Sequence, residues 1–305
     1  MDRLSPLATP SATRAVLERH GLYTKYALGQ NFLVNDDIVK KIVALADVGP
    51  SDRILEVGPG IGTLTAALLQ HAAHVTAIEK DADLPAVLAD TLAPWADKFT
   101  LVRKDALDLE ERDFAAASAL PNKLVSNLPY AVAATVVLDC FQKFPFLESA
   151  TVMVQKEVAD RMMAKPGTKA YGAYTVKLGL FAQPAGRFPV SPGNFFPPPH
   201  VESAVLRLDR AELCDETGAP VSDVVRDAAC IMADAAFANR RKTLANSCKT
   251  YFAGLGERGA QTVEALPTLF EQAGIDPKRR GETLTQQEFI RLGRVAQTSM
   301  TFVPR

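Results

Sequence analysis

Between residues 53 and 155 the chain alternates short apolar runs with longer stretches of helical periodicity. This alternation is typical of βαβ units and predicts an α/β, Rossmann-like fold, a mostly parallel, doubly wound sheet with helices on both faces. An alternating run at 201–208, after a proline-rich stretch, predicts late strands that close one edge of the sheet. The runs expected to form the first strands are Arg53–Val57, His74–Ile78, Phe99–Arg103, Lys123–Ser126 and Ala150–Val154.

The chain of 305 residues is too long for one ordinary small domain and predicts a large domain followed by a smaller one. We expect residues 1–210 to form the α/β domain, with an N-terminal helical segment at 9–46. No strand pattern is evident after residue 210, so residues 211–305 are expected to form a small all-helical domain. Its helical stretches are Ser222–Phe252, Thr262–Ala273 and one that begins at the capping-box sequence Thr285–Glu288.

Composition narrows the class of protein. The net charge is −1, so basic side chains must gather in clusters if the partner is a nucleic acid. The four cysteines show no C-x-x-C spacing, and no set of His, Cys and carboxylate ligands predicts a metal site. The N-terminus lacks a secretion signal and no apolar run is long enough to span a membrane, which predicts a cytoplasmic protein.

A glycine-rich loop connects the first predicted strand to a predicted helix. It reads Glu56-Val-Gly-Pro-Gly-Ile-Gly62, and glycines such as Gly58 and Gly60 let the backbone approach a ligand closely. Dinucleotide sites usually read G-x-G-x-x-G and bind a pyrophosphate, which the Glu56 carboxylate would repel. The loop therefore favours S-adenosylmethionine (SAM), whose methionine end is cationic and phosphate-free, over NAD. A glycine turn without any ligand is the simpler alternative.

Two acidic residues end the next two predicted strands. Glu79 could accept hydrogen bonds from both ribose hydroxyls of the cofactor, and Asp105 could accept one from its adenine amino group. Both lie at carboxyl ends of strands, where ligands bind in doubly wound sheets. Taken alone, Asp105 could instead belong to a solvated turn or cap a helix.

The sequence Asn127-Leu-Pro-Tyr130 follows the fourth predicted strand and points to chemistry at an amino group. The exocyclic amine of adenine is a poor nucleophile because its lone pair is delocalised into the ring. The Asn127 side-chain carbonyl and the Leu128 backbone carbonyl could favour a pyramidal nitrogen whose lone pair faces the methyl group. Pro129 would stiffen the turn and Tyr130 would stack on the base. Without the other motifs, these residues would describe an ordinary strand-ending turn.

A second aromatic residue, Phe195, is closely followed by three prolines that could hold its ring rigidly. We expect Phe195 and Tyr130 to sandwich a flipped-out adenine. The alternative is a core aromatic residue in a proline-rich connection at the edge of the sheet.

Together these residues resemble the rRNA adenine dimethyltransferase family over about residues 20–210, and parts of the C-terminal region are similar as well. The bacterial 16S rRNA branch is a better match than the antibiotic-resistance methylases of large-subunit rRNA. Gly281 departs from the family's usual Arg-Pro-Glu, which puts the local helix geometry in doubt, and Phe196 lies at a variable place. The matching motifs are Leu28–Leu33, Glu56–Gly62, Glu79, Asp105, Asn127–Tyr130, Pro166–Gly172, Phe195–Ser203, Phe237–Leu244 and Arg280–Phe289.

The resemblance implies an enzyme that transfers methyl groups from SAM to the exocyclic amino groups of two adjacent adenosines near the 3′ end of 16S rRNA. The implied partner is the immature small ribosomal subunit during its biogenesis, with the enzyme acting as a monomer. Asn127 would contact both the methionine part of SAM and the target amine. All the implied SAM contacts are Asn31, Leu33, Gly58, Gly60, Glu79, Asp105 and Asn127.

Two basic clusters in the predicted helical domain fit RNA binding. A run of charges is usually a solvated face, but two such runs beside a flipped-base pocket predict phosphate contacts and salt-dependent affinity. The clusters consist of Arg240, Arg241 and Lys242, and of Lys278, Arg279 and Arg280.

Two other functions stay open on the sequence. One is a large-subunit rRNA adenine methylase that confers macrolide resistance. The other is a non-catalytic RNA-binding assembly or transcription factor on the same fold, against which the intact Asn127–Tyr130 motif and cofactor loop argue.

Overall fold

The chain forms two compact units, and the computed structural model describes residues 3–23, 30–114 and 120–299. Unit 1 comprises Met1–Ala159 and Pro184–Arg210, and unit 2 comprises Asp160–Gln183 and Ala211–Arg305. This division differs from the predicted one because residues 160–183 pack with the C-terminal helices. Tyr171 and Val176 in that segment are buried in the hydrophobic core of unit 2.

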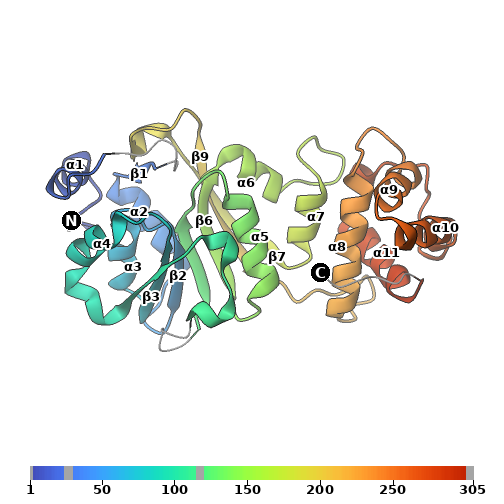
Figure 1. Cartoon of the computed structure of the whole chain (residues 1–305), viewed down its shortest axis with the longest axis horizontal. Coiled ribbons are helices and arrows are strands. Elements are labelled where there is room, and N and C mark those ends of the chain that lie inside the picture. The colour runs from blue at the N-terminus through green and yellow to red at the C-terminus, as the bar shows by residue number, and fades with distance from the viewer. Residues whose placement is uncertain (1–2, 24–29, 115–119, 300–305) are drawn as a thin grey trace. The chain divides into compact units, whose positions relative to one another are not determined.

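Unit 1 is built on a seven-stranded sheet with the strand order β4-β3-β2-β5-β6-β9-β7 (Figure 1). The first five strands in this order run parallel, whereas β9 runs antiparallel to β6. The α/β, Rossmann-like fold predicted from the alternating pattern is therefore confirmed. The strands are β2 Arg53–Val57, β3 His74–Glu79, β4 Phe99–Arg103, β5 Lys123–Asn127, β6 Ser149–Gln155, β7 Ala182–Val190 and β9 Ser203–Arg210.

The central strands are buried along nearly their whole length, which explains their continuous apolar sequences. In β6 every residue from Ser149 to Val154 is buried, and in β2 Arg53 alone is partly exposed. Strands of a parallel sheet covered on both faces show such runs rather than strict alternation. Unit 1 holds helices α1 Pro10–Arg19, α2 Asp36–Ala46, α3 Thr63–Leu69, α4 Leu84–Thr91 and α5 Ala133–Lys143 and short helices η2 Ala93–Lys98, η3 Ala106–Asp108, η4 Glu111–Phe114 and η5 Pro192–Asn194, while α6 Lys156–Met162 spans the unit boundary.

The N-terminal segment is tied to the proline-rich segment by a small second sheet that the sequence did not predict. Strand β1, Phe32–Leu33, pairs antiparallel with β8, Phe195–Phe196. Leu33 lies opposite Phe195 in this pairing, and both side chains are buried in the core of unit 1. Two segments about 160 residues apart in the sequence are thereby brought to the same edge of the unit.

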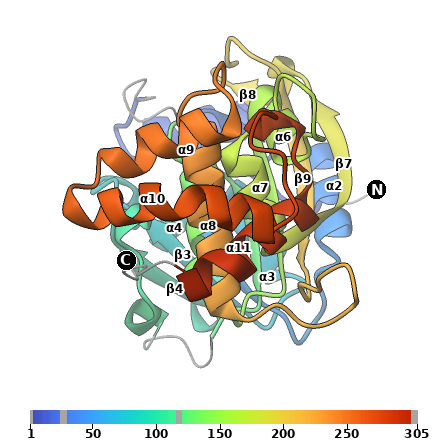
Figure 2. The same ribbon diagram turned by 90° about the vertical axis from the view of Figure 1, so that its right-hand side faces the viewer.

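Among its described residues, unit 2 is helical apart from the first two residues of β7 and an isolated bridge between Cys214 and Pro220, and Figure 2 views it face on. The stretch Ser222–Phe252 is divided into two helices, because the chain turns after Phe237 and Thr243 caps the second helix by accepting from Asn246 N at 3.4 Å. Its helices are α7 Ala173–Gly179, α8 Asp223–Phe237, α9 Leu244–Ala253, α10 Glu257–Gln272, η6 Gly281–Thr283 and α11 Gln286–Ser299.

Two local features of unit 2 follow from single residues. The capping box is confirmed: Glu288 N donates to Thr285 Oγ1 at 3.3 Å, and Thr285 N donates to the Glu288 carboxylate at 2.8 Å. Gly281 packs so closely on α8 that a Cβ atom there would lie 2.7 Å from the Ala236 carbonyl oxygen, so this site accepts no side chain without movement.

Within the described residues, no helix has both the length and the apolar character needed to cross a bilayer.

Candidate functional site

The sheet of unit 1 creates a crevice where the strand order reverses. From β2 the chain proceeds outward to β3 and β4 on one side, and from β5 it proceeds to β6 on the other. In doubly wound sheets, ligands bind at the carboxyl ends of the strands at this switch point. A cavity of about 530 Å³ lies there, a size typical of small-molecule sites. Its lining includes all seven predicted SAM contacts: Asn31, Leu33, Gly58, Gly60, Glu79, Asp105 and Asn127.

Two positions of the loop after β2 require glycine because neighbouring side chains approach the backbone closely there. Gly58 and Gly60 have φ values of +69° and +60°, in the left-handed region that side chains rarely adopt. A Cβ atom on Gly58 would lie 3.3 Å from the Pro129 ring, and one on Gly60 would lie 3.1 Å from the Phe32 ring. The loop can therefore pack between the Asn127–Tyr130 turn and the N-terminal segment only with glycine at these places.

Two polar side chains in the cavity lining have a buried oxygen that lacks a hydrogen-bond partner. Glu56 Oε2 and Thr63 Oγ1 have no hydrogen-bond partner among the described residues. Burial, and then the neighbouring Glu79 carboxylate, raise the pKa of the Glu56 carboxyl to about 8. A buried polar atom without a partner is costly, so these groups mark a place where a polar ligand would be favoured.

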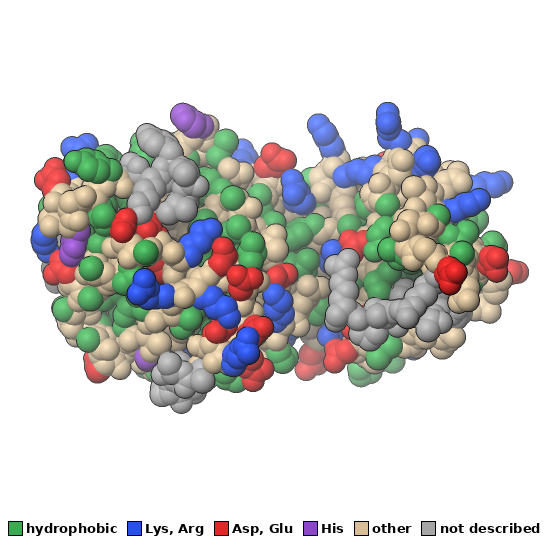
Figure 3. All heavy atoms as spheres, in the orientation of Figure 1, with side chains coloured by type: hydrophobic (Ala, Val, Ile, Leu, Met, Phe, Trp, Pro, Cys, Tyr) green, Lys and Arg blue, Asp and Glu red, His purple; other side chains and the backbone are tan. Residues whose placement is uncertain are grey.

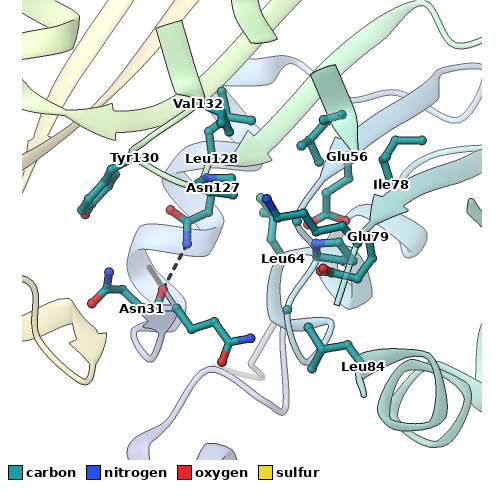
Figure 4. Close-up of a pocket in the computed structure, with 18 of the residues that line it drawn as sticks. Asn31, Glu56, Leu64, Ile78, Glu79, Leu84, Asn127, Leu128, Tyr130 and Val132 are labelled. Atoms are coloured by element: carbon teal, nitrogen blue, oxygen red, sulfur yellow. Dashed lines mark hydrogen bonds between the residues drawn. The ribbon is translucent and has the colours of Figure 1, made fainter. Parts of the chain in front are cut away.

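Glu79 lies at the end of β3, and its carboxylate is held by the turn that follows. Glu79 Oε1 accepts from Asp81 N at 2.8 Å, and Asp81 accepts from the Gln30 side chain at 2.9 Å. Burial raises the pKa of Glu79. The N-terminal segment and the end of β3 thus both contribute to the lining of the cavity, and Figure 4 shows Asn31 and Glu79 among its lining residues.

Asp105 both caps a short helix and lines the cavity, the two positions that the sequence left open for it. One carboxylate oxygen caps η3 by accepting from Leu107 N at 3.0 Å, and the other lies 3.4 Å from Lys80 Nζ. The bond from Leu107 and the charge of Lys80 lower the pKa of Asp105. The residue is a helix cap that also lines the cavity.

The side-chain amide of Asn127 has a defined orientation. Asn127 Nδ2 donates to the Asn31 backbone carbonyl at 3.3 Å (Figure 4). Because a carbonyl only accepts, the amide nitrogen must face Asn31, which leaves Oδ1 as an acceptor on the other side. The Leu128 carbonyl accepts no hydrogen bond from the described residues, although its N–H donates to Met153 at 3.1 Å. Two acceptors are therefore adjacent at this rim of the cavity.

The structure places the two predicted stacking aromatics differently. Tyr130 lines the cavity beside Asn127 (Figure 4), and its hydroxyl lies 2.6 Å from Ser203 Oγ. Phe195 is 4 % exposed and packs in the core of unit 1, opposite Leu33 of β1, and it does not line the cavity. Because Phe195 belongs to β8, which pairs with β1, its ring lies in the core of unit 1 in this structure, and the sandwich with Tyr130 stays a prediction.

Comparison with known proteins identifies the family. Residues 22–290 match the family model described as ribosomal RNA adenine dimethylase. The chain belongs to this family. It is an rRNA adenine methyltransferase that uses SAM as its methyl donor.

Relatives of this rRNA adenine dimethylase are similar along nearly their entire length. Two proteins named "Ribosomal RNA small subunit methyltransferase A" are 40 % identical over 295 residues, in Enterococcus faecalis, and 42 % identical over 290 residues, in Rhodococcus opacus. The alignments cover 96 % and 94 % of this chain and 97 % and 93 % of the relatives.

Solved structures show the same fold. A dimethyladenosine transferase from Plasmodium falciparum superposes with a TM-score of 0.72 at 22 % identity, covering 89 % of this chain and 100 % of the other. The 23S rRNA methyltransferase ErmE superposes with a TM-score of 0.60 at 23 % identity, covering 87 % and 99 %.

The dimethylase cavity fits SAM. The unsatisfied oxygen of Glu56 suits the cationic methionine end, and the Glu79 carboxylate suits the ribose hydroxyls. Residues to which the sequence assigned no individual role complete the lining or support it: Gln30, Thr63, Lys80, Asp81, Gln155 and Ser203.

These additional residues carried weak sequence signals. Asp81 follows Glu79 by two residues, and Ser203 ends the proline-rich motif, but neither spacing alone identifies a partner. Ser203 becomes recognisable only when β9 lies beside β6 and Tyr130 reaches across to it. Leu28 and Gly29, the first two residues of the motif Leu28–Leu33, lie outside the described residues.

The predicted RNA-binding residues all lie in unit 2 and differ in their surroundings. Arg240 pairs with Glu282 at 3.1 Å, and Arg279 forms a two-pronged ion pair with Glu288. The side chains without a partner among the described residues are Arg241, Lys242, Lys278 and Arg280, all of them exposed.

Proposed function

We propose that this enzyme dimethylates two adjacent adenosines near the 3′ end of 16S rRNA in the immature small ribosomal subunit. The observation that carries the proposal is similarity to small-subunit methyltransferases that spans both units of the chain. Substrate choice among RNA methyltransferases depends on surfaces outside the cofactor pocket, so similarity along the whole chain favours the same target class.

The cavity suggests a role for each cofactor-binding residue. Glu79 would accept from the ribose hydroxyls, Asp105 from the adenine amino group, and Gly58 and Gly60 would let the loop backbone approach the methionine part. Asn31 and Leu33 would contact the cofactor from the N-terminal segment. When bound, SAM supplies an electrophilic methyl group on a sulfonium, so no strong base is needed to activate the amine.

The Asn127–Tyr130 turn would hold the target base. Asn127 Oδ1 and the Leu128 carbonyl would each accept one hydrogen of the adenine amine, which pyramidalises the nitrogen and directs its lone pair into the cavity. Tyr130 would stack on the base, and Pro129 would fix the turn. Methyl transfer would exchange the S–C bond of the sulfonium for a new N–C bond and leave a neutral thioether, after which the nitrogen would release its extra proton to water. The hydrogen bond from Asn127 to Asn31 supports this arrangement, because it leaves the correct amide atom facing the amine.

The proposal for Phe195 changes with the structure. Its buried ring would support β1 from below rather than stack on the substrate, so it would act by positioning Asn31 and Leu33. Replacing it with a smaller residue should weaken SAM binding and lower stability together.

The rival functions predict different products. A large-subunit methylase would modify 23S rRNA, and a non-catalytic assembly factor would bind RNA without producing dimethyladenosine. The small-subunit names of the full-length relatives and the complete cavity favour the proposed activity over both. We further propose that the enzyme acts as a monomer in the cytoplasm, where small subunits are assembled.

The test uses small subunits isolated from a strain that lacks the gene. Purified enzyme and SAM are added, and mass spectrometry of nuclease fragments locates each methyl group. We expect two dimethyladenosines in one 16S fragment and none in 23S rRNA. Methylation of 23S rRNA alone, or binding without methylation, would contradict the proposal.

A further inference from the structure

Three segments of unit 2 meet through hydrogen bonds, although they are distant in sequence. The loop before α7 is anchored by Gly167 N, which donates to the Glu282 backbone carbonyl at 2.7 Å. Arg240 binds the side chain of the same Glu282 at 3.1 Å. The start of α9 is joined to the segment before η6, because Leu244 N donates to the Arg279 carbonyl at 2.6 Å. Residues 165–172, 240–244 and 276–284 therefore form one continuous surface.

This surface carries exposed cations from all three segments. Figure 3 shows Lys and Arg side chains along the upper edge of the right-hand part, over the loop before α7 and over α9. Six Lys and Arg side chains on this surface are exposed and form no ion pair or side-chain hydrogen bond with the described residues. They are Lys165, Lys169, Arg241, Lys242, Lys278 and Arg280.

Two arginines of the same surface are engaged in holding the fold. Arg279 binds Glu288 through two nitrogens and also donates to the Thr283 carbonyl at 2.7 Å. Since Glu288 belongs to the capping box of α11, Arg279 links the segment before η6 to that helix. Arg240 is neutralised by Glu282 and lies over the Phe237 ring, 5.9 Å from its centroid.

We propose that the loop Lys165–Ala170 is part of the RNA-binding surface, where Lys165 and Lys169 contact phosphates together with Arg241, Lys242, Lys278 and Arg280. Arg240 and Arg279 maintain the surface rather than bind phosphate. This inference rests on the proposed function, because it assigns the RNA contacts of that same activity. The proposal assigns a role to the motif Pro166–Gly172. Gly167 fixes the loop to η6 through its backbone hydrogen bond, while Lys165 and Lys169 remain exposed.

The chemistry of the surface favours an RNA backbone over an acidic protein. Protein interfaces need a buried apolar centre, and the large apolar side chains exposed among the described residues lie elsewhere in the chain. Phosphates, by contrast, are bound by cations on exposed, flexible stems that release counterions. Six such side chains on three linked segments match a ligand with regularly spaced negative charges.

The test compares two double variants by their salt dependence. Lys165→Ala/Lys169→Ala removes the loop cations, and Lys41→Ala/Lys98→Ala removes two exposed lysines of unit 1 as a charge-matched control. Binding to a short RNA duplex of mixed sequence and to unmethylated small subunits is measured from 50 to 300 mM KCl. Each lost phosphate contact should reduce the slope of log K against log salt by about 0.7–0.9.

We expect the loop variant to lower the slope by about 1.5 on both probes and the control to match the wild type. An unchanged slope for the loop variant, or an equal reduction in the control, would overturn the inference. A wild-type slope near zero on both probes would overturn it as well.

The Arg279→Ala variant distinguishes a residue that binds phosphate from one that stabilises the fold. It should lower the melting temperature by several degrees, while any remaining folded protein keeps a slope close to that of the wild type. A reduction of the slope without a loss of thermal stability would overturn the structural role. Failure of the enzyme to methylate small subunits would count against the proposed function alone, because the duplex measurement does not depend on the methylated site.

Discussion

The hydroxyl of Tyr130 lies 2.6 Å from the hydroxyl of Ser203, which is completely buried and is the first residue of β9. Tyr130 follows β5, whereas Ser203 ends the proline-rich segment, so this contact joins the two motifs expected to handle the base. Burial of the Tyr130 side chain raises its pKa, so the phenol stays protonated and can donate. The ring is thus held by its hydroxyl as well as by its turn.

The first prediction concerns this pair. Tyr130→Phe and Ser203→Ala should each weaken RNA binding or turnover by up to about tenfold, since a lost hydrogen bond costs about 0.5–1.5 kcal/mol. The double variant should be little worse than either single one, because both remove the same bond. Tyr130→Ala should be more severe, with loss of stacking worth about 1–3 kcal/mol. Additive effects in the double variant would show that Ser203 does not position the ring.

The second prediction concerns Asn127. Asn127→Ala should lower the methylation rate about 100- to 1000-fold with the fold intact, because it removes a preorganised acceptor for the amine. Asn127→Asp retains an acceptor but loses the donor to Asn31, so it should fall between the alanine variant and the wild type. Single-turnover rates check both, and wild-type rates in Asn127→Ala would rule out the proposed role.

The product pattern should also change in variants of this turn. Two methyl groups must reach one nitrogen, so the monomethylated amine has to rebind with one hydrogen-bonding contact fewer. A misaligned turn should therefore accumulate monomethyladenosine. A time course that separates mono- and dimethyladenosine in digested RNA measures this ratio, and Lys98→Ala is a suitable control on an exposed residue of unit 1.

The third prediction concerns the ribose contact. Glu79→Ala should weaken SAM binding strongly, since hydrogen bonds to a charged group are worth about 1.5–3 kcal/mol each. Glu79→Gln should keep one acceptor and the bond from Asp81, so its loss should be smaller. Calorimetric titration measures both affinities, and unchanged binding in Glu79→Ala would remove this residue from the site.

The fourth prediction follows from the pKa of about 8 at Glu56. In the ligand-free protein this carboxyl binds a proton that the unfolded chain releases near pH 4.5, so its contribution to stability falls as pH rises between these values. Glu56→Gln cannot ionise, and it should gain stability relative to the wild type by up to about 1.4 kcal/mol per pH unit in that window. Urea unfolding at pH 6, 7 and 8 gives the comparison.

Cofactor binding should reverse the protonation of Glu56. The cationic end of SAM would favour the carboxylate, so binding near pH 7 should release a proton from the wild type and not from Glu56→Gln. Titration calorimetry in two buffers with different ionisation enthalpies counts the proton. Identical proton release in both proteins would place its source elsewhere.

Much of unit 1 could be predicted from sequence because its signals are local. The apolar runs at 53–57 and 150–154 became β2 and the main part of β6, since buried parallel strands need continuous apolar side chains. The glycine loop was recognisable because Gly58 and Gly60 adopt left-handed conformations that other residues rarely accept. Glu79, Asp105 and Asn127 were recognisable because the carboxyl ends of parallel strands meet at one edge.

The sequence by itself determined which side chains end each strand, and thereby which polar groups surround the cavity. Only the tertiary structure decided how those groups are used. Strand β1 pairs with β8, which buries Phe195, and the Asn31 carbonyl orients the Asn127 amide. These contacts join residues from about 100 to 160 positions apart. Their existence depends on the packing of whole elements, which local periodicity and motif spacing do not encode.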